Sequence, residues 1–281
     1  MRVATWNVNS VKSRLPRLLT WLDERAPDVV CLQETKLSDD AFYTQLGPEF
    51  DCRGYQFAHV GQGQWNGVAI LSRIGLDDVR SGFADAPGYP DPDSAPEARA
   101  VSAICGGVRI YSLYVPNGRE LDSDHYRYKL AWLDRLRAAV ALDAASTMLC
   151  GDINIAPTDA DVFDPAAFAG QTHVSVAERL ALADIQGLGL RDVVRDRWPD
   201  EQVFSYWDYR AGMFYKNLGI RIDLILAGAD ISDRVAAAWV DRAARKGTKP
   251  SDHAPVIVDL DNAPDGDIGP MVPPPSRRTR V

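Results

Sequence analysis

The stretch LCGDINIAP, residues 149–157, places a carboxylate and a carboxamide at the end of a buried strand. The apolar run before Gly151 predicts a strand that is covered on both faces. Asp152 and Asn154 follow it at once. A buried strand gains no stability from such groups at its exit, because each must find a hydrogen-bond partner or a counter-charge there. We therefore interpret this edge as a site that requires a negative charge and a fixed amide.

The rest of the chain predicts sheets covered by helices. Apolar runs bounded by turn residues predict strands at 2–8, 28–33, 67–72, 99–105, 108–115, 146–151, 220–227, 235–240 and 255–260. Helical periodicity predicts helices around 15–22 and 126–140, and a capping box, Ser175 with Glu178, begins a third. Strands outnumber the helices scattered among them, which predicts a layered α/β domain.

Composition narrows the class of protein. The 281 residues are 46% hydrophobic and 25% charged, which is typical of a globular domain. No stretch approaches the ~18 apolar residues of a membrane span, and the N-terminus lacks a signal-peptide pattern. We expect a cytoplasmic protein with no membrane partner. Its cysteines form no C-x-x-C pair, which favours reduced thiols over disulfides or zinc.

Domain organisation follows from the same composition. We expect one catalytic domain over residues 1–261, because no linker interrupts the predicted strands before that point. The segment from 261 onward has five prolines and no apolar period, so 262–281 is expected to be a disordered, proline-rich tail.

Net charge gives a mixed indication about partners. The formal charge of −8 argues mildly against nucleic acid, because phosphate binding uses Lys and Arg. The segment 242–249, however, holds four basic residues, which could contact a DNA backbone: Arg242, Arg245, Lys246 and Lys249.

Several other predicted strands end in polar residues, as the opening stretch does. These residues are Asn7, Glu34, Tyr114 and Asn117, and the pair Asp252 and His253 comes just before the last predicted strand. Each alone has an ordinary explanation, because Asn and Asp are common turn formers. Asp223 is harder to explain, since it lies in an otherwise apolar strand and an unpaired buried charge is costly. We expect it to pair with His253 and to fix that ring's tautomer.

Together these groups suit a metal-assisted hydrolysis of a phosphate ester. Carboxylates without cysteines or clustered histidines favour a hard cation, Mg²⁺ or Mn²⁺. His253 can donate to a phosphate oxygen, and Asp152 can orient or deprotonate a water. Asn154, Asn117 and Tyr114 can position the phosphate and that water.

Seven motifs resemble those of one family. WNVNS, LQETK, YVPNG, GDINIAPTD, SYWDYR, RIDLIL and SDHAP occur in order from about residue 2 to 260. They resemble the motifs of exonuclease III-type abasic-site (AP) DNA endonucleases, within the endonuclease/exonuclease/phosphatase superfamily. The resemblance implies a four-layer α/β/β/α sandwich of two mixed sheets flanked by helices, with the site at one end.

The same resemblance implies roles for individual residues. Glu34 corresponds to the principal Mg²⁺ ligand. The other implied metal-site residues are Asn7, Asp152, Asn154 and, at a second position, Asp252. The implied catalytic residues are Tyr114, Asp152, Asn154, Asp223 and His253. Asn117 corresponds to a phosphate-site group, and Lys36 and Arg99 correspond to residues near the metal and the acid network of the site. We expect all three to contact the substrate. The resemblance does not decide whether Asp152 or His253 carries the proton.

The implied activity is cleavage 5′ to an abasic site in duplex DNA, with 3′→5′ exonuclease and 3′-phosphatase or phosphodiesterase side activities. The implied partner is double-stranded DNA with abasic sites or blocked 3′ ends, and we expect a monomer.

The aromatic segment 204–209 has two interpretations. Its aromatic residues alternate with polar ones, which fits either a half-buried strand or a pocket for a flipped-out sugar that lacks its base. We assign Tyr206 and Trp207 to the pocket, as substrate-binding residues, and Phe204 to the core. Ile220 stands where animal relatives carry a second Trp, which leaves the balance of abasic-site cleavage and exonuclease action open.

Two rival functions remain at this point. One keeps the fold and the phosphodiester chemistry but changes the substrate, as in an inositol-phosphate phosphatase, a sphingomyelinase or a nonspecific nuclease. The other is a DNA-binding module that has lost its chemistry, although such a protein would not need all of the acids and the histidine named above.

Overall fold

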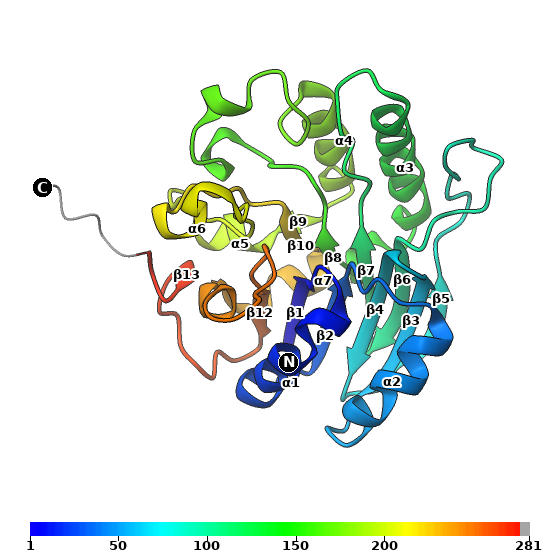
Figure 1. Cartoon of the computed structure of the whole chain (residues 1–281), viewed down its shortest axis with the longest axis vertical. Coiled ribbons are helices and arrows are strands. Elements are labelled where there is room, and N and C mark those ends of the chain that lie inside the picture. The colour runs from blue at the N-terminus through cyan, green and yellow to red at the C-terminus, as the bar shows by residue number, and fades with distance from the viewer. Residues whose placement is uncertain (276–281) are drawn as a thin grey trace, which may run out of the picture.

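The protein is a sandwich of two sheets with helices on both outer faces, in a computed structural model that describes residues 1–275 (Figure 1). The first sheet has the order β13-β11-β12-β1-β2-β4-β3 and the second β5-β6-β7-β8-β10-β9. This confirms the predicted four-layer α/β/β/α arrangement.

The strands of the first sheet are β1 (Arg2–Asn7), β2 (Val29–Gln33), β3 (Gln56–Gln62), β4 (Trp65–Ser72), β11 (Val235–Asp241), β12 (Val256–Leu260) and β13 (Met271–Val272). Those of the second are β5 (Asp77–Ser81), β6 (Ala100–Cys105), β7 (Val108–Tyr114), β8 (Thr147–Asp152), β9 (Arg191–Asp192) and β10 (Asp223–Ala227). The helices are α1 (Val11–Arg25), α2 (Asp39–Asp51), α3 (Asp124–Val140), α4 (Val176–Gln186), α5 (Val193–Arg197), α6 (Met213–Lys216) and α7 (Ala229–Ser232).

Side-chain alternation along the strands divides the core into layers. In β8, Met148 and Cys150 belong to the cluster between the two sheets, whereas Leu149 packs under α3 and α4. In β1, Val3 faces the inter-sheet cluster and Trp6 packs under α1. Because successive side chains of a strand point to opposite faces, one apolar run can serve two layers.

Two parallel strand pairs bring the polar strand ends to one edge. β1 pairs with β2 so that Asn7 lies opposite Gln33, next to Glu34. β7 pairs with β8 so that Tyr114 lies opposite Asp152. Parallel strands end at the same edge of a sheet, and the two sheets face each other, so residues far apart in sequence meet there.

Gly151 explains part of the opening stretch. A Cβ at this position would lie 1.9 Å from the carbonyl oxygen of Leu113 in the neighbouring strand. Only glycine permits this close approach, and the approach sets Asp152 beside Tyr114.

The C-terminal segment differs from the expected disorder over 262–275. Met271 is buried, β13 pairs in parallel with β11, and Val240 N donates to Pro270 O (2.9 Å). Met271 packs into the core, and Asp265 and Asp267 pair with Arg2 and Arg197, so the segment is held without an apolar period. Residues 276–281 lie outside the described part of the chain. Across residues 1–275, none of the helices has the length and apolar character that a membrane crossing requires.

Candidate active site

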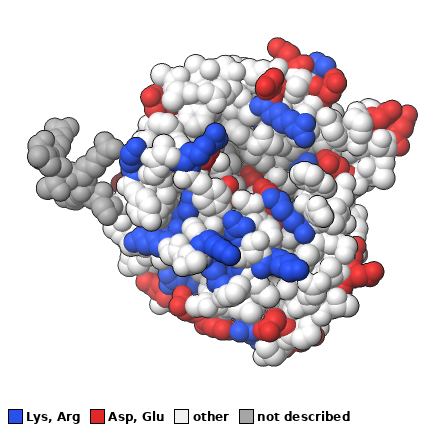
Figure 2. All heavy atoms as spheres, in the orientation of Figure 1, with Lys and Arg blue, Asp and Glu red and all other residues white. Residues whose placement is uncertain are grey.

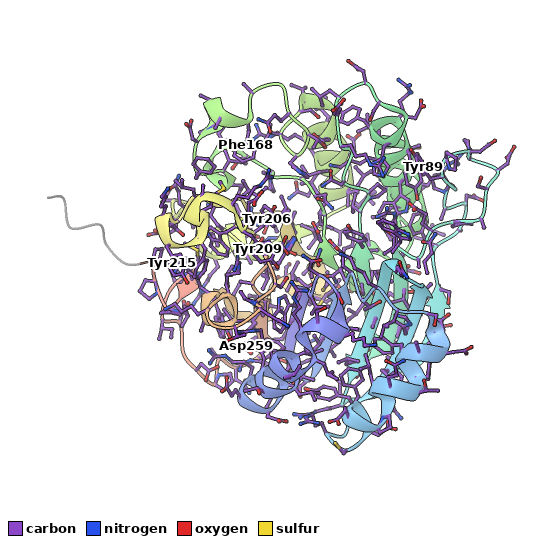
Figure 3. The ribbon with its side chains drawn as sticks, viewed as in Figure 1. Tyr89, Phe168, Tyr206, Tyr209, Tyr215 and Asp259 are labelled. Atoms are coloured by element: carbon purple, nitrogen blue, oxygen red, sulfur yellow. The ribbon has the colours of Figure 1, made fainter. Side chains whose placement is uncertain are left out.

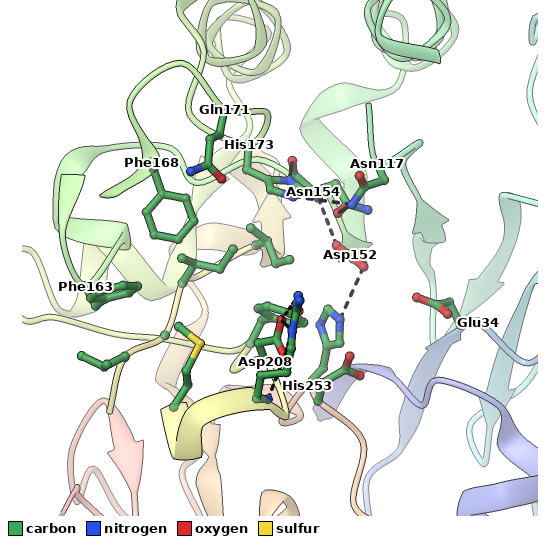
Figure 4. A pocket seen from close by; sticks show the side chains of 18 of the residues that line it. Glu34, Asn117, Asp152, Asn154, Phe163, Phe168, Gln171, His173, Asp208 and His253 are labelled. Carbon is green, nitrogen blue, oxygen red and sulfur yellow. Dashed lines mark hydrogen bonds and ion pairs between the residues drawn. The ribbon is translucent and has the colours of Figure 1, made fainter. Parts of the chain in front are cut away.

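The polar strand ends line one cavity of about 460 Å³ at the shared edge of the two sheets (Figure 4). Its polar side holds Glu34, Tyr114, Asn117, Asp152, Asn154, Asp252 and His253. Its other side is largely apolar, with Phe163, Phe168, Met213, Leu218, Ile220 and Ile222. A mostly apolar cavity with a few convergent polar groups is the usual form of a ligand site.

Two carboxylates and one imidazole lie together at the polar side. One ligand atom each of Glu34, Asp152 and His253 lies within 4.8 Å of the other two. Asn7 bridges the two carboxylates, because its Nδ2 donates to Glu34 Oε1 (2.9 Å) and to Asp152 Oδ2 (2.9 Å). Like charges at this distance repel, so the group requires a cation or a proton to be stable.

Lys36 supplies one of these cations. Its Nζ lies 2.7 Å from Glu34 Oε2 and also donates to Asn9 Oδ1 (2.7 Å). Burial alone would raise the pKa of Glu34, but Lys36 and the Asn7 amide outweigh it and lower that pKa. Glu34 is therefore ionised at neutral pH.

Asp152 has no such lysine beside it. It is fully buried, and burial together with the Asp223 and Glu34 carboxylates raises its pKa to about 7, although His253 acts against them. Its Oδ1 accepts from the Asn154 backbone N–H (3.0 Å), which fixes the carboxylate in one orientation. A carboxyl group that titrates near neutral pH can accept a proton during a reaction.

His253 carries a positive charge. Its Nδ1 lies 2.8 Å from Asp223 Oδ2, as predicted, and its Nε2 faces Asp152 Oδ2 at 3.8 Å. Burial alone would lower the pKa of His253, but the Asp223 and Asp152 carboxylates raise it to about 10. Ser205 supports the pair, because its Oγ donates to Asp223 Oδ2 (2.6 Å).

Asn154 and Asn117 form the upper wall of the cluster in Figure 4. Asn117 Nδ2 donates to Asn154 Oδ1 (3.2 Å), and Asn154 Nδ2 donates to Val115 O (2.9 Å). Asn154 is in the left-handed region with φ 55°, as are Glu34 and Lys36. Such conformations cost energy in residues other than glycine and concentrate at functional sites.

Tyr114 lies on the same side, but Arg99 lies behind it. The Arg99 guanidinium sits 4.9 Å from the Tyr114 ring centroid and pairs with Glu97 (2.7 Å). Burial and the Glu34 and Asp152 carboxylates raise the pKa of Tyr114, so its hydroxyl stays protonated and can donate. Arg99 is buried and does not line the cavity, nor does Lys36, which differs from the expected direct substrate contact.

The donor set fits a hard divalent cation. Glu34 and Asp152 offer carboxylate oxygens within a few ångströms of each other, and such oxygens are preferred by Mg²⁺ and Mn²⁺. A protonated His253 cannot be a ligand, because both ring nitrogens carry hydrogens.

Asn7 differs from the ligand expected from the sequence, and Asp252 lies apart from the three clustered groups. Asn7 Oδ1 accepts from the Asn9 N–H (2.9 Å), so the amide nitrogen of Asn7 faces the carboxylates. Asp252 lines the cavity but is held by Asn9 Nδ2 (3.1 Å), outside the group of three. Asn9 thus links Lys36 with Asp252, a role that the sequence did not indicate.

The aromatic segment is divided differently from the prediction. Tyr206 lines the cavity and its ring centroid lies 4.9 Å from that of His253. Phe204 is in the core, as predicted. The assignment of Trp207 to the pocket is wrong, because this side chain is fully buried against Phe214. The segment does not form a regular strand, and its alternation therefore does not decide which ring faces the cavity.

The basic segment also differs from the expectation. Arg242 and Arg245 are buried, and they donate to the carbonyls of Phe214 (2.8 Å) and Trp207 (3.0 Å). They brace the wall of the cavity and are not free to hold a DNA backbone. Lys246 and Lys249 are exposed.

The face that contains the cavity is basic. Figure 2 shows Lys and Arg side chains gathered around the central hollow, with most Asp and Glu side chains toward the outline of the molecule. A negative net charge and a basic face therefore coexist in one chain.

Several cavity residues carried no recognisable signal in the sequence. The loop before α4 contributes Phe163, Phe168, Gln171 and His173, and the loop before α6 contributes Asp208 (Figure 4). Phe168 and Tyr206, also labelled in Figure 3, come from different loops and line the same cavity. These residues lie in irregular segments, where no periodicity marks the side that faces a site.

Comparisons with known proteins agree with this geometry. The model of the endonuclease/exonuclease/phosphatase family matches residues 4–253. An exodeoxyribonuclease of Bacillus subtilis is 30% identical over 261 residues, which cover 91% of this chain and 98% of that protein. An AP endonuclease structure from Archaeoglobus fulgidus has 36% identity and a TM-score of 0.86, and covers 93% of this chain and 100% of its own. A structure of the 3′ phosphatase NExo from Neisseria, bound to a product DNA hairpin, has 36% identity, a TM-score of 0.87 and the same coverage.

Proposed function

Because the chain belongs to the endonuclease/exonuclease/phosphatase family, and within it to the exonuclease III and AP endonuclease type of DNA repair nuclease, we propose that it cleaves the phosphodiester 5′ to abasic sites in duplex DNA. We propose 3′→5′ exonuclease and 3′-phosphatase or phosphodiesterase activities at the same site, with Mg²⁺ or Mn²⁺ as the cofactor and residues 1–261 as the catalytic domain.

One observation carries this proposal. Glu34, Asp152 and His253 are far apart in the sequence, yet their ligand atoms lie within 4.8 Å of one another in a cavity that Tyr114 and Asn117 also line. Two carboxylates, a cationic imidazole and a fixed side-chain amide together form a site that can hold a phosphate group and a water molecule.

Glu34 and Asp152 would hold the metal, with Asn154 beside them and Asp252 at a second position. A divalent ion bound there neutralises charge on the phosphate and lowers the pKa of a bound water. Asn7 keeps the two carboxylates together through its paired donors.

His253 and Asp152 would divide the proton chemistry. His253 is cationic at neutral pH, so its Nε2–H is a donor to a phosphate oxygen and the ring is no base. Asp152 lines the cavity and is oriented by the Asn154 N–H (3.0 Å), which supports it as the group that accepts the proton of the attacking water. The Asp223 carboxylate fixes the tautomer and the charge of His253.

The remaining groups position the substrate. Asn117 and the Tyr114 hydroxyl are placed to donate to the phosphate. Tyr206, Ile220 and the phenylalanines of the apolar side would enclose a sugar that lacks its base, because they present apolar surface to it.

In a second candidate function, the main activity is the processing of 3′ ends and not the cleavage of abasic sites. An exodeoxyribonuclease and a 3′ phosphatase are among the relatives above, at 30% and 36% identity. The discriminating experiment compares initial rates on an abasic duplex, a recessed 3′ end and a 3′-phosphate in one buffer, with an undamaged closed-circular duplex, which has no 3′ end, as the control. We expect the abasic duplex to be cut fastest. A fast 3′-phosphate release without abasic cleavage would favour the second candidate, and inertness on all three would refute both.

A further inference from the structure

A fully buried lysine lies behind the loops that carry Asn117 and Asn154. Lys129, in α3, is 0% exposed and does not line the cavity. Its Nζ donates to Asn154 O (2.7 Å) and to Asn117 O (3.2 Å), and it pairs with Glu178 of α4. A buried ammonium is costly unless each of its donors is used, and here all three are used on the two loops and one helix.

Glu178 has an equally complete set of partners. Its Oε2 accepts from Ser175 N (3.1 Å) and Ser175 Oγ (2.6 Å), which completes the capping box of α4. Its Oε1 accepts from Thr172 Oγ1 (2.7 Å) and His173 N (3.0 Å), at the end of the loop that forms the cavity wall. The carboxylate therefore caps a helix and anchors that loop at once.

The partners of this ion pair are also linked to one another. His173 Nδ1 lies 2.6 Å from Asn154 O, and its Nε2 lies 3.5 Å from Asn117 Nδ2. Packing around the pair is tight, because a Cβ at Gly118 would lie 2.5 Å from Thr172 Oγ1 and 3.2 Å from Lys129 Cδ. The backbone of three cavity residues thus shares one rigid anchor.

We propose that Lys129 and Glu178 are positioning residues, which set the orientation of Asn117, Asn154 and His173 in the cavity without contacting the substrate. Stability alone does not explain the pair, because two well-packed apolar residues in place of a buried ion pair are often as stable or more so. The hydrogen bonds to the two loop carbonyls explain why charges are present here. The inference rests on the proposed function for its kinetic consequence only.

The main test uses the double variant Lys129→Met/Glu178→Met, which removes both charges together and leaves no unpaired ion. We expect its Tm to lie above that of either single variant, because no charge is left unpaired, but below that of the wild type, because the capping box of α4 and the hydrogen bonds to the loops are lost. We expect kcat on the preferred substrate to fall about 10- to 100-fold, the usual cost of losing groups that orient ligands, with KM little changed. Lys129→Arg, which keeps the charge and the donors, should retain more of kcat than Lys129→Met.

A matched control is available at the opposite end of β1. Arg2 and Asp259 also form a buried pair, with Nε and Oδ1 2.7 Å apart. The variant Arg2→Met/Asp259→Met should leave kcat unchanged. An equal fall of kcat in this control, or a wild-type kcat in the Lys129/Glu178 double variant, would overturn the proposal. If the double variant does not fold, Thr172→Val, which removes one hydroxyl only, must still lower kcat.

A readout without turnover separates this inference from the proposed function. Hydrogen exchange of the backbone at 115–118, 153–156 and 172–175 should quicken in the double variant, while β1 and β2 keep their protection. Unchanged exchange in those segments would refute the anchor even if the wild type cleaved none of the DNA substrates, whereas inactivity of the wild type counts against the proposed function alone.

Discussion

His253 is the residue whose charge the site controls most closely. Two carboxylates flank it, Asp223 at 2.8 Å from Nδ1 and Asp152 at 3.8 Å from Nε2. They outweigh the burial that would otherwise favour a neutral ring, and raise its pKa to about 10. The imidazolium is therefore maintained across the physiological range, and its second N–H is directed at the cavity.

Replacing Asp223 should lower the pH at which this charge is lost. In Asp223→Asn the main raising charge is gone, so the pKa of His253 should fall from about 10 toward the ordinary value of ~6.5. NMR titration of the ring in metal-free protein measures it directly. The alkaline limb of the rate against pH should move to lower pH in the same direction. A ring pKa that stays near 10 would refute the pairing.

Neutralising either reacting group should abolish most turnover. In Asp152→Asn and His253→Asn we expect kcat to fall about 10²- to 10⁴-fold, the usual contribution of a positioned acid or base, with duplex affinity nearly unchanged. Fluorescence anisotropy with labelled duplex measures affinity, and gel-resolved cleavage measures kcat. Asp184→Asn, on the exposed side of α4, is the matched control. Full activity in either site variant contradicts its assigned role.

For single residues, the sequence predicted which side chains lie close together, but it predicted their orientations less well. The strand-end acids and the Asp223–His253 pair come together as the motifs implied. Asn7 turns its amide nitrogen to the carboxylates, and Trp207 turns into the core. These orientations depend on single contacts, of Asn7 with the backbone of Asn9 and of Trp207 with the ring of Phe214, which the alternation of polar and apolar residues does not specify.

Among the elements, the segment before β10 is held by a buried ionic cluster. Arg221 is fully buried and donates to Asp161 Oδ1 (2.6 Å) and to Asp192 Oδ2 (2.7 Å). Arg195 of α5 donates to the same oxygen of Asp161 (2.6 Å). Ile220 and Ile222, on either side of Arg221, line the cavity, so this cluster fixes part of the site's apolar wall.

Because of this ionic cluster, the free energy of unfolding should decrease as the pH falls into the acid range. Burial opposes the charge of Asp161, but Arg221 and Arg195 lower its pKa below the ordinary value of ~3.9. The ionised Asp161 carboxylate therefore stabilises the protein fully above pH ~4, the pKa of the unfolded chain. This stabilisation is lost as the pH falls through the lower pKa that Asp161 has in the folded protein. Asp161→Asn should cost about 3–5 kcal/mol at pH 7, because it leaves buried arginines under-paired.

Urea denaturation from pH 7 to pH 2.5 measures this dependence. The difference in unfolding free energy between wild type and Asp161→Asn should shrink as the pH falls below ~4. A difference that stays constant with pH would show that the charge of Asp161 does not carry the effect.

Helices and strands with a strong apolar periodicity were predictable from the sequence, and those without such periodicity were not. The helices α1, α3 and α4 and the central strands lie where the apolar pattern placed them. The pattern missed α2, whose last turns contain Gly47 and Pro48, and β5, whose residues are all exposed at a sheet edge. The strand expected from residue 220 begins at Asp223, because Ile220 forms isolated bridges with Tyr206 and Val162 instead of joining the sheet ladder.

For the whole molecule, the distribution of charge matters more than its sum. The chain carries a net −8, yet its cavity face is ringed by Lys and Arg (Figure 2). A polyanion approaching that face meets a local positive field, while the acidic remainder repels it in other orientations. This asymmetry could not be read from composition, because it depends on which residues the fold brings to one face.

Duplex binding should accordingly weaken with salt. The logarithm of the association constant should fall linearly with the logarithm of salt concentration, by about 0.9 per phosphate contacted. Lys246→Ala should reduce that slope by about one contact, since Lys246 is exposed and follows Arg245, which donates to the aromatic segment that carries Tyr206. Arg135→Ala, on the exposed side of α3, should leave it unchanged. Equal slopes in all three proteins would contradict this placement of the binding face.

The most direct test is the dependence of single-turnover cleavage of an abasic duplex on Mg²⁺, in wild type and in Glu34→Gln. The account predicts no cleavage by wild type in EDTA, full recovery when Mg²⁺ is returned, and a need for about 10- to 100-fold more Mg²⁺ in Glu34→Gln. Cleavage by wild type that ignores EDTA, or a Glu34→Gln variant with an unaltered Mg²⁺ requirement, would contradict the account.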